Sequence, residues 1–286
     1  MGRWYNFDGD EAMRWLIVTA DELGLSAKRN QGIVDAHCKG IVTSASMLAY
    51  GPTFREAVKV AKALPTLDIG LHLNFSDGEP LVLGHQTLVN KDGAFWGRTE
   101  ARRLAREGKF DLRDIEREAD AQIDTLKSAG VKITNLSSVD HLHIRGNLSQ
   151  ALALVAKKHG IRCFRCPADR VRPPSLKLAP DRLAAVQEYQ ESALNAVSVY
   201  AQQRMRSTEN FGGAALTGSL TTELLIETLR SLPVGLTELM VHPGIQAAES
   251  GFEGPDRQTE LKALTDPRLK PLLKELGIGL THFGKL

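Results

Sequence analysis

The sequence predicts an α/β fold in which about seven parallel strands and their connecting helices form a barrel. Short apolar runs rich in β-branched residues alternate with longer segments of helical period, as in βα units around a parallel sheet. Capping residues flank several of the helical segments. The chain has 286 residues, of which 42% are hydrophobic and 24% charged, so it can bury the core of one large domain. We expect that domain to comprise residues 1–286.

The candidate strands are apolar runs bounded by polar or glycine-containing segments. They are Leu16–Ala20, Ile41–Leu48, Leu67–Phe75, Ile133–Ile144, Ile161–Cys166, Thr237–Val241 and Ile278–Phe283. The candidate helices have apolar residues at helical spacing and charged residues between them. They are Ser26–Lys39, Thr53–Ala63, Asp111–Ala129, Leu148–Lys158, Thr221–Arg230 and Arg257–Leu276.

Caps support these helices, and two stretches depart from the βα pattern. Ser26 and Thr221 are residue types that begin helices, whereas Gly160 follows a helix as a terminating glycine should. Residues 78–98 are rich in glycine and polar residues, which predicts a long loop over one face. Residues 170–205 begin with a Pro-Pro break and are expected to form an insertion of mixed helical character.

Charge and hydropathy restrict the classes of partner and location. The 36 Lys and Arg residues against 34 Asp and Glu residues give a formal net charge of +2, so no nucleic acid partner is predicted. No apolar run reaches the roughly 18 residues of a membrane span. The first residues, MGRWYNFDGDEAMRW, carry acids where a signal peptide needs a positive end and an apolar stretch. With only three cysteines, the chain is predicted to be cytoplasmic.

Residue types with useful chemistry fall at the carboxyl ends of the candidate strands, where ligands bind in parallel α/β folds. They are Asp21, Glu22, His72, Asp140, His141, His143, Arg165 and His242. Four of the chain's eight histidines belong to this set, which favours one site over a scatter of surface residues.

The adjacent acids Asp21 and Glu22 predict a cation nearby. Two like charges at one position raise the pKa of one of them unless a cation neutralises them. A divalent metal is the simplest such cation. A carboxylate with two imidazoles can hold zinc or a related ion and leave positions open for water and substrate. The alternative is that His72, Asp140 and His143 are ordinary residues of the barrel rim.

Ordered blocks of the sequence resemble the YdjC-like carbohydrate deacetylase family. TADELGLS followed by Asn30 and Gly32 is similar to the family's ADDFGLS opening, and AHCKGIVTSASML is similar to its second block. GLHLNFSDGEPL resembles the GLHL block, and VDHLHI stands where a histidine-rich HxHxH strand is expected. RCP, ELMVHPG and the final stretch up to Phe283 complete the pattern, which begins at Leu16.

This resemblance implies a distorted (β/α) barrel related to polysaccharide deacetylases. The implied activity is removal of acetyl from an N-acetylated sugar or oligosaccharide with a bound divalent ion, Mg or Zn. Matched by position, Asp21 is the implied catalytic base, and Glu22, His72 and His141 are the implied metal ligands. Members of the family are often dimeric, so a homodimer is one expectation.

The resemblance also implies roles for residues around the acetyl group. Arg165 is expected to stabilise the tetrahedral oxyanion, and His242 to protonate the departing amine. His143 and Asp140 are expected near the substrate, with His143 as the alternative fourth-strand metal ligand. Apart from the resemblance, the aromatic residues Trp96, Phe95 and Tyr50 are candidates for stacking on a sugar ring, with Trp96 in the long loop as the expected one.

Two positions depart from the family pattern. Glu22 stands where the family has its second aspartate, and Val139 stands at the first histidine of the histidine-rich strand. These departures support one alternative, a sugar-binding barrel protein that has lost catalysis. Another alternative is a metal-dependent hydrolase of a different amide or of a phosphoester, because the same ligand types serve several reactions.

Overall fold

Eight parallel strands form the centre of the protein in the computed structural model, which describes residues 13–248 and 253–286. Most of the acidic opening segment therefore lies outside the described residues. The strands are β1 (Arg14–Leu23), β2 (Ser44–Met47), β3 (Asp68–Leu73), β4 (Asn135–Ser138), β5 (Cys163–Phe164), β6 (Asn210–Gly212), β7 (Gly235–Val241) and β8 (Ile278–Leu280).

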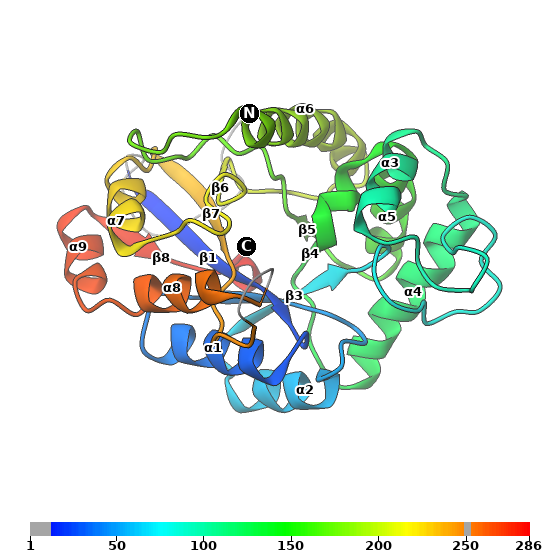
Figure 1. Ribbon diagram of the computed structural model, residues 1–286, viewed down its shortest axis with the longest axis horizontal. Coiled ribbons are helices and arrows are strands. Elements are labelled where there is room, and N and C mark those ends of the chain that lie inside the picture. Colours follow the sequence, from blue (N-terminus) through cyan, green and yellow to red (C-terminus); the bar gives the residue numbers. More distant parts are fainter. Residues whose placement is uncertain (1–12, 249–252) are drawn as a thin grey trace.

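Helices surround these strands (Figure 1). They are α1 (Ala27–Cys38), α2 (Phe54–Ala63), α3 (Arg98–Arg106), α4 (Leu112–Ser128), α5 (Gly146–Lys158), α6 (Pro180–Gln202), α7 (Thr222–Arg230), α8 (Pro255–Leu264) and α9 (Leu269–Glu275). Two short 3-10 helices, η1 (Val139–Ile144) and η2 (Phe283–Lys285), follow β4 and β8. Within the described residues, no helix is both long and apolar enough to cross a bilayer.

The strands lie in the order β5-β4-β3-β2-β1-β7-β6. β8 pairs with the first part of β1, Arg14–Leu16, and β2 pairs with its later part from Thr19 onward. Between the two edges of this sheet, near β5 and β6, the described residues form isolated bridges, such as Asp169 with Phe211, in place of a continuous ladder. The sheet is therefore a curled and incompletely closed barrel, which confirms the predicted fold class.

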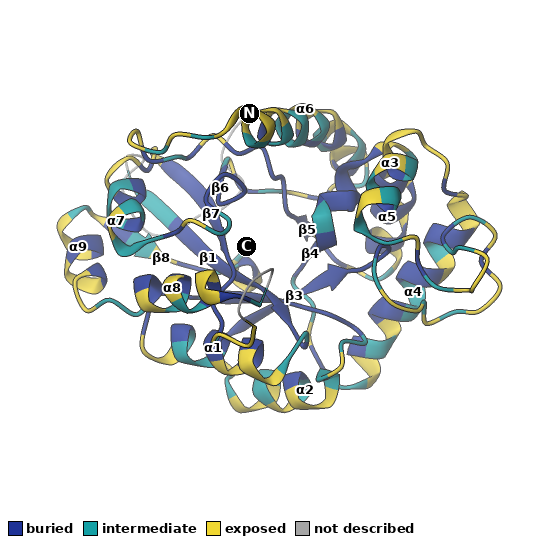
Figure 2. Cartoon of the chain, viewed as in Figure 1, coloured by how far each residue is buried: buried dark blue, intermediate teal, exposed yellow. Residues whose placement is uncertain are grey.

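The strands are buried because helices cover the barrel on its outside (Figure 2). Successive residues of a strand point to opposite faces. Accordingly, Leu16 and Val18 of β1 belong to the main apolar core, whereas Ile17 packs in a second cluster with Leu236 and Phe283. This burial on both faces explains why β1 reads as a continuous apolar run and not as an alternating one.

Most predicted elements are present, and the exceptions have local causes. β6 is only three residues long, so its apolar signal is too short to recognise. The predicted helix Arg257–Leu276 is two helices, α8 and α9, separated near Pro267. The predicted loop 78–98 is largely irregular, and α3 begins at its end. The insertion at about residues 170–205 contains the long helix α6.

The predicted strand Ile133–Ile144 is wrong in its second half. β4 ends at Ser138, and the chain turns into η1. Asp140 and His141 adopt left-handed conformations, with φ of 52° and 53°, which a strand cannot contain. The Ser138 hydroxyl accepts a hydrogen bond from the backbone N–H of His143 at 2.9 Å and so stabilises the turn. His141 and His143 therefore do not lie on one face of a strand.

Helix α1 packs closely against the loop that follows β7. A Cβ atom on Gly32 of α1 would lie 2.4 Å from the Cα atom of Gly244. Backbone atoms cannot move aside as a flexible side chain can. This contact requires glycine at position 32, and it fixes the loop that begins with His242.

We expect Gly32→Ala to lower the free energy of unfolding by about 1–3 kcal/mol, because the added methyl group overpacks this contact. The measurement is urea denaturation followed by circular dichroism. Gln31→Ala is the control, since Gln31 is the exposed neighbour on the same helix. Equal midpoints for the two variants would contradict the prediction.

Candidate functional site

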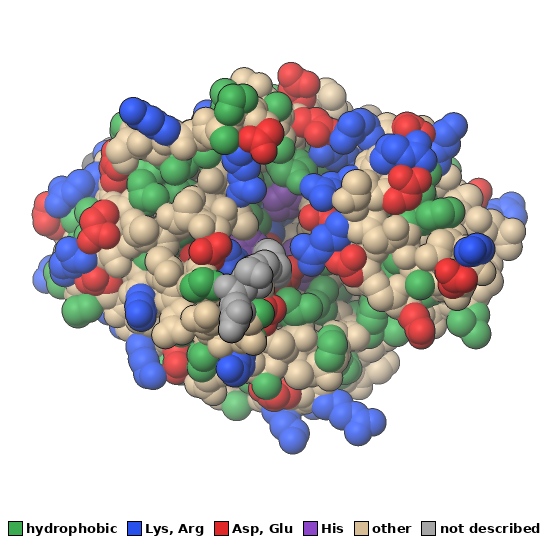
Figure 3. All heavy atoms as spheres, viewed as in Figure 1, with side chains coloured by type: hydrophobic (Ala, Val, Ile, Leu, Met, Phe, Trp, Pro, Cys, Tyr) green, Lys and Arg blue, Asp and Glu red, His purple; other side chains and the backbone are tan. Residues whose placement is uncertain are grey.

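A pocket of about 270 Å³ opens where the carboxyl ends of the strands meet. The predicted residues that line it are Asp21, Glu22, His72, Asp140, His141 and His242. Arg165 and His143 are completely buried and do not line it. Figure 3 shows Lys and Arg side chains gathered around the central hollow of this face, with histidine atoms visible inside it. The fold therefore brings six of the predicted site residues, from distant parts of the chain, into one pocket at the strand ends.

A local irregularity in β1 presents its two acids to the pocket. The pairing of β1 with β2 shifts register between Ala20 and Leu23. Glu22, inside that shift, has a φ of 71° in the left-handed region. A bulge of this kind changes the direction of side chains that would otherwise alternate across the strand. Asp21 and Glu22 consequently both line the same pocket.

Asp21 is held by a buried ion-pair network that crosses the barrel. Arg165, just after β5, donates to both carboxylate oxygens of Asp21, at 2.6 and 2.7 Å. Its Nε atom donates to Glu238 of β7 at 3.0 Å. Burial alone would raise the pKa of Asp21, but the Arg165 guanidinium outweighs this effect and holds that pKa well below its usual range. Asp21 is therefore a carboxylate.

His72 is connected to Asp21 through Ser46, a residue that the sequence analysis missed. The Ser46 hydroxyl donates to Asp21 at 2.7 Å and lies 3.0 Å from Nδ1 of His72. The Ser137 hydroxyl lies 2.9 Å from the same Nδ1 atom and donates to the carbonyl of Leu71. Because both hydroxyl protons are used elsewhere, Nδ1 is the protonated nitrogen of a neutral ring. Burial lowers the pKa of His72 to about 4, so this ring is neutral and Nε2 carries its lone pair.

The two histidines of η1 have different surroundings. His143 is bound on both ring nitrogens, by the Ser138 hydroxyl at 2.8 Å and by the carbonyl of Arg165 at 2.9 Å. His143 therefore connects η1 to the end of β4 and to the segment that follows β5. His141 lines the pocket, and its ring makes edge contacts with Tyr189 and Phe211. Burial lowers the pKa of both rings below the usual value for histidine.

His242 lines the pocket from the end of β7. The Glu260 carboxylate of α8 accepts the backbone N–H of His242 at 2.6 Å. Arg29 of α1 donates to the carbonyl of His242 at 2.9 Å. Burial lowers the pKa of His242 well below its usual value, so its imidazole is neutral at pH 7. Both backbone groups of this residue are thus fixed by charged side chains.

Arginines, which the sequence analysis did not select, complete the pocket wall. Arg98 and Arg102 come from α3, and Arg182 comes from α6. Arg182 donates to the carbonyls of Ala214 and Thr217 at 2.6 and 3.1 Å. No short motif marks these residues, because they lie in segments whose approach to the strands depends on the complete fold.

The aromatic residue of the pocket is Tyr189, and it too was missed. The predicted sugar platform, Trp96, lies outside the pocket lining, and its indole N–H donates to the carbonyl of Thr87 at 2.8 Å. This hydrogen bond joins two parts of the loop 78–98, so Trp96 stabilises that loop. Tyr189 reaches the pocket because α6, within the predicted insertion, covers that side of the barrel (Figure 1).

The predicted metal ligands do not fit a bound divalent ion as they are arranged. Within residues 13–248 and 253–286, no three His, Cys, Asp or Glu side chains form a group that could hold a metal. The two oxygens of Glu22 face the guanidinium groups of Arg98 and Arg29, at 3.6 and 3.7 Å. His72 keeps Nε2 available, which is the single nitrogen that an imidazole offers a metal, so the misfit arises at Glu22 and not at His72. Glu22, His72 and His141 thus share a pocket without converging on one point.

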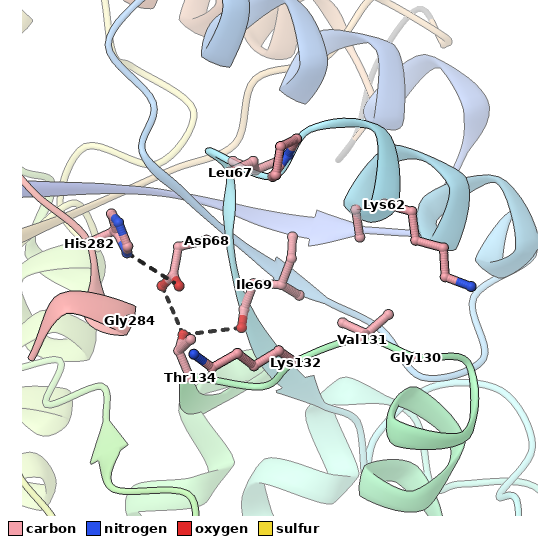
Figure 4. A pocket seen from close by; sticks show the side chains of 12 residues that line it. Lys62, Leu67, Asp68, Ile69, Gly130, Val131, Lys132, Thr134, His282 and Gly284 are labelled. Atoms are coloured by element: carbon pink, nitrogen blue, oxygen red, sulfur yellow. Dashed lines mark hydrogen bonds and ion pairs between the residues drawn. The ribbon is translucent and has the colours of Figure 1, made fainter.

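A second pocket of about 300 Å³ lies at the opposite ends of the strands (Figure 4). Asp68, at the start of β3, accepts a hydrogen bond from the Thr134 hydroxyl at 2.8 Å and lies 3.4 Å from Nδ1 of His282. None of the predicted site residues lines this pocket. The chemistry predicted from the sequence is therefore confined to the carboxyl ends.

The fold and the pocket define a parallel (β/α) barrel protein with an acid, histidine and arginine site at the strand ends. The chain belongs to the YdjC-like protein family, whose pattern matches residues 15–275. This match confirms the resemblance seen in the sequence.

Named relatives agree with this assignment over nearly complete chains. A carbohydrate deacetylase of Homo sapiens is 31% identical, and the match covers 93% of this chain and 88% of that protein. A carbohydrate deacetylase of Brevibacillus brevis is also 31% identical, over 95% of this chain and 99% of that protein. A putative cellobiose-phosphate cleavage protein from Enterococcus faecalis V583 has the same fold, with a TM-score of 0.74, 23% identity and coverage of 95% and 98%.

We expect Arg165→Met to lower the free energy of unfolding by about 3–5 kcal/mol, because it leaves Asp21 and Glu238 buried without their counter-charge. Urea denaturation provides the measurement. Arg162→Met, at an exposed position three residues earlier, should change stability little. A loss of less than about 1 kcal/mol for Arg165→Met would mean that the network is not buried as described.

Asp169 supports the pocket wall and gives a pH-dependent term. Its carboxylate accepts the backbone N–H of Ala215 at 2.5 Å, next to the residues that hold Arg182. Burial raises the pKa of Asp169 from 3.8 to about 6. The folded state therefore binds the proton more tightly than the unfolded state, and stability from this group decreases as pH rises from about 4 to 6.

We expect Asp169→Asn to remove this term, which amounts to about 3 kcal/mol above pH 6. Between pH 4.5 and 7, the unfolding free energy of the wild type should therefore decrease relative to that of the variant. Urea denaturation at both pH values measures it, with Asp92→Asn in the exposed loop as the control. A constant difference at the two pH values would contradict the assignment.

Proposed function

We propose that this protein is a hydrolase that removes the acetyl group from N-acetylated carbohydrates. The observation that carries the proposal is the hydrogen-bonded series Asp21–Ser46–His72 at the pocket, in a chain of the YdjC-like family. Membership and the names of the relatives support a carbohydrate substrate. The series supports hydrolysis, because it joins a carboxylate to a neutral imidazole beside a space for substrate.

The base in this proposal is the Asp21–Ser46–His72 unit. The sequence alone places the base at Asp21, but Arg165 and Ser46 already bind both of its oxygens. The free lone pair of the unit is on Nε2 of His72. In this proposal a water molecule attacks the acetyl carbonyl, and Nε2 of His72 accepts the proton that the water loses. The Asp21 charge stabilises the resulting imidazolium through Ser46. This is the division of roles that a carboxylate and a histidine have in catalytic triads.

The leaving amine requires a proton from another wall of the pocket. His242 comes from β7, whereas His72 comes from β3, so the two rings approach from different strands. Because its imidazole is neutral, we assign His242 as a relay, in which one ring nitrogen gives its proton to the departing amine while the other accepts a proton from solvent water. Proton exchange with solvent restores both rings, and the products are acetate and a free amino sugar.

Positive charge for the oxyanion comes from the pocket surface in this proposal. The sequence assigned that role to Arg165, which is 0% exposed and does not line the pocket. Arg165 is a positioning residue for Asp21. Arg98, Arg102 and Arg182 do line the pocket and offer N–H groups to developing negative charge. Tyr189 provides the aromatic surface for the sugar ring.

A divalent ion, Mg or Zn, is the cofactor that the sequence predicts for this reaction. Because Glu22, His72 and His141 do not fit such an ion as arranged, each step above belongs to a side chain of the protein.

We expect Asp21→Asn to reduce acetate release from N-acetylglucosamine oligomers by about 10²- to 10⁴-fold, the usual contribution of acid–base groups. An enzymatic acetate assay gives the rate, and circular dichroism establishes that the variant is folded. Asp92→Asn makes the same chemical change in the exposed loop and should leave the rate unchanged. Full activity of a folded Asp21→Asn protein would remove Asp21 from the mechanism.

A sugar-binding protein without catalysis is the second candidate. The replacement of the family's aspartate by Glu22, with its two arginine neighbours, favours it. Calorimetric binding of chitobiose with no acetate release by the wild type would support this candidate over the hydrolase.

A further inference from the structure

Each acid that lines the pocket has an arginine as its charge partner. Asp21 binds Arg165 at 2.6 Å. Asp140 lies 4.0 Å from Nε of Arg102. Glu22 lies between two arginines, with Oε1 at 3.6 Å from Arg98 and Oε2 at 3.7 Å from Arg29. The carboxylates that would attract a dication are thus already paired with guanidinium groups.

The two arginines at Glu22 are held in place by other groups. Arg29 is completely buried, and it donates to the carbonyl of His242 at 2.9 Å and to Glu253 at 2.6 Å. Arg98 donates to Asp77 at 2.5 Å. Both guanidinium groups thus have partners other than Glu22, and Arg29 in particular is held on all sides because it is completely buried.

Distance makes this arrangement unfavourable for a metal. A carboxylate oxygen lies about 2.0–2.2 Å from a bound zinc ion. An ion on either oxygen of Glu22 would therefore lie no more than about 6 Å from a fixed guanidinium. Like charges at that separation repel strongly beside Arg29, which is buried, and less strongly beside Arg98, whose side chain is 33% exposed and partly screened by water. The remaining predicted ligands, His72 and His141, are neutral and cannot offset that repulsion.

We propose that Arg98 and Arg29 take the electrostatic place of a divalent ion, so that this pocket does not bind one. This proposal rests on the pocket of the proposed function, but ion binding tests it, whereas turnover tests the proposed function. The additional methylene of Glu22, compared with the family's aspartate, extends its carboxylate toward the two arginines. The departure at Glu22 and the presence of Arg98 are thus parts of one arrangement.

Ion binding by the full-length wild-type protein is the first test. After dialysis against a chelator, Co²⁺ is added and its visible absorption is recorded, and thermal unfolding is followed with and without Zn²⁺. We expect no new cobalt band and no change in Tm. A single tight site, at an ion concentration about 100-fold above Kd, would raise Tm by roughly 5 °C or more. Such a rise with a stoichiometric cobalt band would overturn the proposal.

Removal of the arginine is the second test. Arg98→Gln combined with Glu22→Asp restores the family's acid and removes one fixed positive charge. We expect this double variant to gain a cobalt band and a Zn²⁺-dependent Tm, and further change of His72→Ala to abolish both. Arg103→Gln with Glu22→Asp is the matched control, because Arg103 is an exposed residue of the same helix that pairs with Glu100 and Glu107. A folded Arg98 variant that binds no ion would overturn the role of Arg98.

Activity separates this proposal from the proposed function. If acetate is released and the rate is unaffected by chelator, both proposals are supported. If chelator abolishes acetate release and an added ion restores it, the arginine proposal fails and the hydrolase proposal stands. If no acetate is released, the hydrolase proposal fails, and the cobalt and Tm measurements still decide the ion question.

Discussion

The buried contact of Arg165 with Asp21 and Glu238 is the constraint on which the rest of the pocket depends. β5 is at one edge of the sheet order, whereas β1 and β7 lie near the other, so this contact crosses the barrel interior. A charge buried on all sides is stable only when counter-charges and hydrogen bonds surround it. Asp21 must therefore face inward, and the irregularity in β1 that follows places Glu22 beside it. The position of Asp21 follows from the Arg165 interaction, and that of Glu22 from the irregularity beside it.

The same contact organises the histidines. Ser46 donates to Asp21 and thereby sets the proton on Nδ1 of His72, while the carbonyl of Arg165 binds His143 and anchors η1. His242 belongs to a different arrangement, in which Arg29 and Glu260 hold its backbone. Two sets of charged residues thus support the two walls. A substrate between them would meet a neutral imidazole on each wall and the arginines of the same pocket lining, which suits a reaction that moves protons and develops negative charge.

Arginine side chains have two roles in this pocket. Guanidinium groups remain charged at all physiological pH values and can bind two acceptors at once, so they are well suited to buried ion pairs. Here they serve as internal partners of carboxylates and also form part of the surface open to ligands. Burial raises the pKa of Glu22 to about 7 despite its two arginine neighbours. The electrostatic balance of the site is therefore close, and single substitutions should move it measurably.

The sequence by itself determined the barrel class, most of its strands and the placement of Asp21, Glu22, His72 and His242 at one end, because apolar periodicity and strand ends are local properties. The sequence blocks shared with the family lie in those same segments, so the resemblance to the family can also be recognised from the sequence. Only the tertiary structure decided the turn at His141, the charge partners of the acids and the arginine wall. Ser46, Arg98, Arg182 and Tyr189 act through partners far away along the chain, and no local pattern records which distant side chain each will meet.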